Sequence, residues 1–366
     1  MGYTGEKDIY IKLMEDITGL KIDPNTPILQ SQEELKGATE EAKKLDEALK
    51  HSRDEFQNNL NIKDLRVGCA PENEVGYVEP CPIQYMGNIK QGKKFHCVFL
   101  GLNPHLEPWR SFPVKSTFAD LANFHHPDDV HYNLPKERYS LSGTMKNNYW
   151  RVMGNMEPEY GKAWSDYYTF AIRIHLALLP NGSEDIYNKW EDLKSVPNLT
   201  NHLLAKLTEF PVANLELVPY KSTKFSISKF ENLFQEDNND VFAKKYRAYF
   251  YDMMDFVNEY ATDDAYIIAT ASTATLDVLY KVLKRYKKTL FGTKEEHFFV
   301  YNKIKKQLDK GGKKPNELAP MYLFKWGNRK IIVTSPISGN NTGYKFIYTD
   351  FENGWIDAIK GHSFAD

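Results

Sequence analysis

Hydrophobic residues recur at helical spacing in two long segments of the chain. In residues 31–60, the apolar stripe that predicts an amphipathic helix holds Leu35, Ala38, Ala42, Leu45 and Leu49. Ser31 is a suitable N-cap for this helix, and Glu33 and Glu34 suit its first turn. In residues 239–260, a second stripe predicts another such helix through Phe242, Tyr246, Tyr249, Phe250, Met253, Met254 and Val257.

Four short apolar runs predict strands. They cover residues 95–100, 212–218, 266–270 and 330–334. Continuous apolar runs of this length are typical of strands buried on both faces of a sheet. Segments with helical patterns separate them, and helical crossovers imply parallel pairing. We therefore predict an α/β protein with three layers, α/β/α, around a central, mostly parallel four-stranded sheet.

The same pattern of apolar and polar residues predicts that the chain consists of an N-terminal extension and an α/β domain. Residues 66–94 contain Pro71, Pro80 and Pro82 and predict an irregular connection. Residues 1–94 are thus predicted to form an N-terminal helical and irregular extension packed on the core. Residues 95–366 form the α/β domain, with a large insertion at about 106–210 that has no clean period and is rich in aromatic residues.

The composition favours a globular protein and bears on whether it holds a metal or crosses a membrane. Hydrophobic residues make up 42% of the 366 positions and charged residues 26%, which fits a globular chain with a large core. Three widely spaced cysteines, Cys69, Cys81 and Cys97, form no zinc motif and are too few for a four-thiolate cluster. We expect no metal and no cofactor. The first residues lack a signal-peptide pattern and no spanning apolar run is present, so we expect a cytoplasmic protein without a membrane partner.

Charge is unevenly distributed. The net charge is −2, but residues 281–314 hold eleven Lys and one Arg against three acidic residues, a local charge of +9. Such a segment could bind phosphates, or it could be a solvated helix face and a basic loop. The aromatic content of 14% leaves a similar choice between core packing and base stacking.

The first predicted strand ends in a compact polar motif, Leu100-Gly101-Leu102-Asn103-Pro104-His105. The glycine permits close backbone approach, and the proline fixes the direction in which the chain leaves the strand. The Asn103 amide could orient a water molecule and bind a polar group, or could serve only the turn.

Gly-Leu-Asn-Pro after an apolar strand resembles the first motif of the uracil-DNA glycosylase superfamily. The resemblance implies that Asn103 directs the attacking water and that Leu102 and His105 lie against the base. It also implies an aromatic residue that stacks on the base, for which we prefer Phe118 over Phe112. Asp120 is the candidate for a catalytic carboxylate, with a turn or cap role as its alternative.

Two further segments extend the resemblance, which covers roughly residues 95–125 and 210–340. Asn214 matches an asparagine that contacts the pyrimidine edge in the family, although a structural role remains open. The end of the second family motif matches the segment after the last strand, where Ser335 would bind a phosphate and Ile337 would wedge into the duplex. The DNA-binding candidates are Ser222, Ser335, Pro336, Ile337 and Ser338.

One departure from the family bears on the substrate. Val333 occupies the usual His or Asn position and removes a hydrogen bond to the pyrimidine. Together with the insertion, this favours excision of a bulky modified cytosine, glucosylated hydroxymethylcytosine in phage DNA, as a defence. The resemblance thus implies a monomeric DNA glycosylase that flips a base out of double-stranded DNA. The alternatives are a uracil or mismatch repair glycosylase, a non-catalytic DNA-binding protein of this fold, and an α/β enzyme acting on a small molecule.

Overall fold

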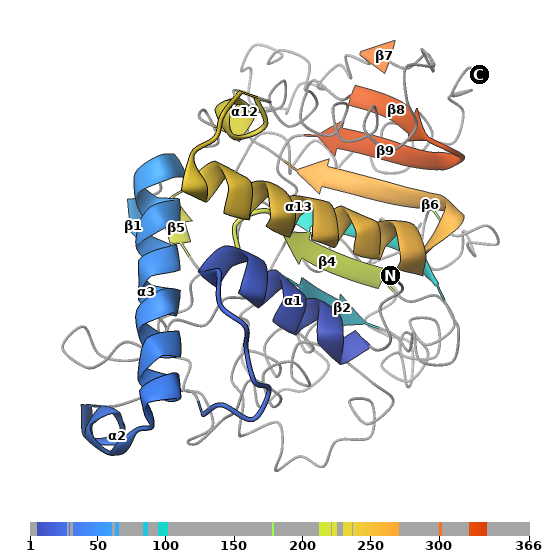
Figure 1. Ribbon diagram of the computed structural model, residues 1–366. Helices are drawn as coiled ribbons and strands as arrows, with labels where there is room; N and C mark the ends of the chain where they lie inside the picture. Colours follow the sequence, from blue (N-terminus) through green and yellow to red (C-terminus); the bar gives the residue numbers. More distant parts are fainter. Residues whose placement is uncertain are drawn as a thin grey trace, which may run out of the picture. The chain divides into compact units, whose positions relative to one another are not determined.

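The computed structural model describes two compact units. The described residues are 6–27, 29, 32–60, 63–65, 83–86, 94–101, 178, 212–220, 222–224, 230–235, 237–270, 300–301 and 322–334. Unit 1 comprises residues 1–92, 101–147 and 213–260, and unit 2 comprises residues 93–100, 148–212 and 261–366. Each unit is therefore assembled from segments that are distant in the sequence (Figure 1).

Unit 1 is mainly helical in its described part. Its helices are α1 (Glu6–Thr18), α2 (Gln32–Gly37), α3 (Glu40–Leu60), α12 (Phe230–Leu233) and α13 (Val241–Tyr260). Its strands are β1 (Lys63–Leu65), β2 (Ile83–Met86), β4 (Val212–Glu216, of which Val212 groups with unit 2) and β5 (Ser222–Lys224). β1 pairs antiparallel with β5, and β2 is the neighbour of β4.

Helix α13 forms the centre of unit 1 and confirms the helix predicted over residues 239–260. Asp240 caps it, because its carboxylate accepts a hydrogen bond from the Ala243 N–H at 3.2 Å. The predicted apolar stripe is buried along its length. Figure 1 shows α1 running alongside α13. α3 packs near the beginning of α13, where Phe56 makes edge-on ring contacts with Phe242 and Tyr246.

The single helix predicted over residues 31–60 is two helices, and this is a correction. The chain leaves helical geometry at Ala38 and Thr39, between α2 and α3. Thr39 then caps α3, with its hydroxyl accepting a hydrogen bond from the Ala42 N–H at 3.3 Å. A threonine side chain that satisfies the backbone in this way favours a new helix start over continuation. The proposed cap Ser31 lies outside the described residues.

Unit 2 contains a mixed sheet. Its strands are β3 (Phe95–Gly101, of which Gly101 groups with unit 1), β6 (Ala261–Thr270), β7 (Val300–Tyr301), β8 (Tyr322–Trp326) and β9 (Arg329–Thr334). Their spatial order is β3-β6-β9-β8-β7. β3, β6 and β9 pair in parallel, whereas β8 pairs antiparallel with β9 and with β7. The chain is therefore an α/β protein with a buried parallel sheet centre, as the sequence predicts.

The predicted count of four strands is too low. β8 and β9 form a hairpin in which Trp326 lies opposite Arg329, and Gly327 in the turn has a φ of 60°. That φ is accessible to glycine without strain, which allows a two-residue turn. β6 also begins at Ala261, five residues before the predicted start at Tyr266. The exposed Asp263 and Asp264 in its first half hide the strand from an apolar pattern.

In the part of the chain that the structure describes, no helix combines the length and the apolar character needed to cross a bilayer.

Candidate functional site

The structure describes two of the predicted site residues. Asn214 lies in β4 and Ser222 begins β5, both in unit 1. The other predicted site residues lie outside the described residues; they are Leu102, Asn103, His105, Phe118, Asp120, Ser335, Pro336, Ile337 and Ser338. The last described residues before the two motif segments, Gly101 and Thr334, are both strand ends.

The parallel strands of unit 2 end at one level. Leu100 of β3 pairs with Ala269 of β6, and Ala269 pairs with Val333 of β9. All three residues are fully buried. Because neighbouring strands lie about 4.8 Å apart, the backbones at Leu100 and Val333 are separated by roughly 10 Å, with β6 between them. Leu100, Ala269 and Val333 therefore lie at the same edge of the unit 2 sheet, which is the edge where α/β sheets bind ligands.

A buried carboxylate lies directly against the glycine of the first motif. A Cβ atom at position 101 would overlap Oε2 of Glu216 and would come within 2.9 Å of its Cδ and 3.0 Å of its Oε1. Glu216 is 4% exposed. The sequence predicts a close approach at Gly101, and the structure identifies the approaching group as the Glu216 side chain. Both residues belong to unit 1.

Backbone hydrogen bonds hold this contact in place. The Leu217 N–H donates to the Gly101 carbonyl at 2.9 Å. The hydroxyl of Tyr249 donates to the Glu216 carbonyl, and the hydroxyl of Tyr246 donates to the Leu217 carbonyl at 3.0 Å. Burial raises the pKa of Tyr246 well above its usual value, so its hydroxyl stays protonated and remains a donor. Helix α13 thus anchors the end of β4 and, through it, Gly101.

Glu216 was not predicted as a site residue from the sequence. The sequence does show that it is a charged residue inside an apolar run, Val212-Ala213-Asn214-Leu215-Glu216-Leu217-Val218. Charged side chains are rarely fully buried without a specific partner or task. The pattern indicates that such a carboxylate is unusual, but only the structure places it against Gly101.

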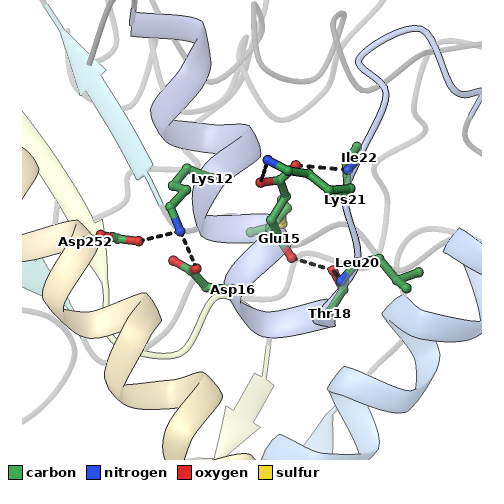
Figure 2. A network of polar contacts seen from close by, with 9 residues as sticks. Lys12, Glu15, Asp16, Thr18, Leu20, Lys21, Ile22 and Asp252 are labelled. Carbon is green, nitrogen blue, oxygen red and sulfur yellow. Dashed lines mark hydrogen bonds and ion pairs between the residues drawn. The ribbon is translucent and has the colours of Figure 1, made fainter. Parts of the chain in front are cut away.

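A second polar cluster joins α1 to α13. Lys12 Nζ lies 2.7 Å from an Asp16 oxygen and 2.8 Å from an Asp252 oxygen, as Figure 2 shows. Burial, followed by the neighbouring Asp252 carboxyl, raises the pKa of Asp16 to about 7. Burial lowers the pKa of Lys12, but its hydrogen bonds with the two carboxylates outweigh this and raise it. All three side chains lie on helices and face one another, so the cluster links the helices.

Neither a metal-binding cluster in the described part of the chain nor a comparison with known proteins adds a residue to the candidate site. Within the described ranges, no group of three or more His, Cys, Asp or Glu side chains is arranged to hold a metal ion. No family model matches the chain, and no curated protein or solved structure matches it significantly. In unit 1, the described part of the candidate site consists of Gly101 and Glu216.

Proposed function

We propose that this protein is a DNA glycosylase of the uracil-DNA glycosylase kind that removes a bulky modified pyrimidine. The observation that carries the proposal is the row formed by Leu100, Ala269 and Val333. This row supports the proposal because the two strands that precede the motif segments end at the same edge of the unit 2 sheet. The resemblance of those segments supplies the chemistry.

The reaction needs groups that the chain possesses. A flipped pyrimidine would be held through Leu102, His105, Phe118 and Asn214, while Asn103 orients the attacking water. Ser335 and Ile337 would contact the backbone and fill the space that the base leaves, with Pro336, Ser338 and Ser222 nearby as DNA contacts. Breaking the glycosidic bond places positive charge on the sugar and negative charge on the base, so fixed polar groups accelerate it.

The substrate follows from Val333. This side chain is fully buried in β9, and valine offers no hydrogen bond to a base. A repair enzyme for uracil would be expected to carry a histidine or asparagine there. We therefore propose glucosylated hydroxymethylcytosine in phage DNA as the target and defence as the role. The protein would act as a monomer on double-stranded DNA in the cytoplasm, with a three-layer α/β/α fold.

The test uses three DNAs, which contain uracil, no modification, or glucosylated hydroxymethylcytosine. We expect alkali-labile abasic sites in the glucosylated DNA alone. Asn103→Ala should reduce their formation by about 100-fold or more, because the water loses its orienting amide. Asn59→Ala is the matched control, since the Asn59 amide donates to the Glu55 carbonyl within α3.

Other results would identify a different function or contradict the proposed one. Abasic sites in uracil DNA alone would identify a repair glycosylase. Salt-sensitive binding to DNA without any abasic sites would identify a binding protein of this fold. Neither binding nor cleavage of any of the three DNAs would contradict the proposal altogether.

A further inference from the structure

We propose that the Glu216 carboxylate is the group that takes the proton from the attacking water. This inference rests on the proposed glycosylase function and adds a catalytic carboxylate to it. The sequence offers Asp120 for such a role, with a turn or cap role as its alternative, whereas the structure places the Glu216 carboxylate against Gly101. Substitution of Glu216 and substitution of Asp120 should therefore have different effects on the rate of abasic-site formation.

Glu216 contacts the residue that precedes the proposed water-directing residue by two positions. Asn103 follows Gly101 by two positions, and two residues span at most about 7 Å between Cα atoms. The Glu216 side chain is packed directly on Gly101. The carboxylate therefore lies against the point from which the chain continues to Asn103.

The position of Glu216 is fixed on both sides by hydrogen bonds. Its carbonyl accepts a hydrogen bond from Tyr249, and the next N–H donates to Gly101. The carboxylate is thus carried by a backbone that is fixed before substrate binds, so less of the site has to reorganise during the reaction. With an exposed fraction of 4%, it is also shielded from bulk water, which strengthens its interaction with a positively charged sugar.

The bond between C1′ of the sugar and the pyrimidine N1 breaks, and its electron pair leaves with the base. The water oxygen forms a new bond to C1′, and one water proton passes to the Glu216 carboxylate. That proton then passes to the departed base or to solvent, which restores the carboxylate. No metal, oxidant or cofactor is required.

The first experiment compares three variants on the DNA that the wild-type protein cleaves. Glu216→Gln keeps the side-chain size but removes the proton acceptor, so the rate of abasic-site formation should fall by about 100-fold or more. The wild-type rate should also fall toward acid pH, and this dependence should vanish in Glu216→Gln. Asp46→Asn is the control and should stay within about threefold of wild type, because Asp46 is a buried carboxylate on α3. Asp120→Asn tests the rival candidate and should reduce the rate by less than Glu216→Gln does. A large loss in Asp120→Asn with none in Glu216→Gln would overturn the inference while the proposed function stands.

A second experiment separates catalysis from packing. Gly101→Ala should lower the unfolding midpoint, because the new methyl group overlaps the Glu216 carboxylate. Adding Glu216→Ala removes the overlap and should restore the midpoint. If Glu216 takes the proton, the double variant remains inactive although it is stable. Recovered activity in the double variant would show that Glu216 only supports the fold.

Binding provides a measurement that needs no turnover. The probes are duplexes that carry either a cationic pyrrolidine or a neutral tetrahydrofuran in place of the sugar. A carboxylate beside the sugar should favour the cationic probe by about tenfold or more, and Glu216→Gln should remove the preference. This result would support the inference even if the three DNAs are not cleaved. Equal affinity for both probes in the wild-type protein would contradict it.

Discussion

At the scale of single residues, Gly101 shows how one side chain restricts another position. The carboxylate of Glu216 occupies the space that a Cβ atom would need, so the reason for the glycine here is lack of space. By contrast, a Cβ atom at Gly37, the last residue of α2, would meet nothing within 4 Å. The two glycines therefore differ in what an added methyl group would do.

We expect Gly101→Ala to lower the free energy of unfolding by about 1–3 kcal/mol, the usual cost of overpacking a core. Gly37→Ala should leave it unchanged or raise it by up to about 1 kcal/mol, because alanine favours helix over glycine. Urea unfolding followed by circular dichroism measures both variants. Equal stability of the two would contradict the crowding seen at Gly101.

The sequence predicts the conformational freedom of Gly101 but not the identity of the side chain that packs against it. It indicates that Gly101 permits a close approach, because glycine followed by a turn is a local pattern. It does not indicate which side chain approaches, because Glu216 is 115 positions away, as 216 minus 101 gives. Contacts over such distances depend on strand pairing and helix packing, which no local pattern records. Most of the predicted site lies outside the described residues and stays a prediction.

At the scale of elements, the contact between α1 and α13 depends on pH. The pKa of Asp16 is about 7 in the folded protein against an ordinary value of 3.8. Between these values the folded state holds a proton that the unfolded state has released. The free energy of unfolding therefore falls as pH rises from about 4 to about 7, and the loss is complete above that range.

Asp16→Asn should remove this dependence, because the amide cannot lose a proton. We expect the variant to gain on the order of 1 kcal/mol relative to wild type between pH 5 and pH 8. Urea unfolding at the two pH values measures the change. Asp23→Asn is the control, since Asp23 is exposed and its oxygen accepts hydrogen bonds within its own turn. A parallel response of Asp16→Asn and wild type would refute the assignment.

Elements with strong local patterns were predicted well. Helix α13 begins at Val241 against a predicted start at residue 239, and β9 ends at Thr334 as expected. The break at Ala38 and Thr39 was not predicted, because the apolar spacing continues across it. β8 was not predicted either, although Gly327 and Asn328 before Arg329 are a hairpin signal.

At the scale of the whole molecule, the proposed function requires contact with a polyanion despite a net charge of −2. The basic segment 281–314 would provide this contact. Replacing Lys303, Lys305 and Lys306 with Gln should reduce the slope of log affinity against log salt by about 2–3, since each phosphate contact contributes about 0.9. Fluorescence anisotropy with labelled duplex DNA at several salt concentrations measures the slope.

The control variant replaces three lysines that are exposed in unit 1, Lys21, Lys36 and Lys44. It removes the same charge from a different place. If both triple variants change the slope equally, binding follows net charge and the basic segment has no special role. If neither changes the slope, the basic segment is a solvated surface, and DNA contact must come from elsewhere.

The pairing of α1 with α13 has a consequence for how the protein is made. Lys12 and Asp252 are separated by 240 residues, as 252 minus 12 gives. At about 5–20 residues per second, the ribosome needs roughly 12–48 s to produce the partner of the first helix. During that time the apolar side of α1, with Ile9, Leu13 and Ile17, has no native surface on α13 to cover it. The nascent chain therefore offers chaperones a binding segment in α1 until translation has passed Tyr260.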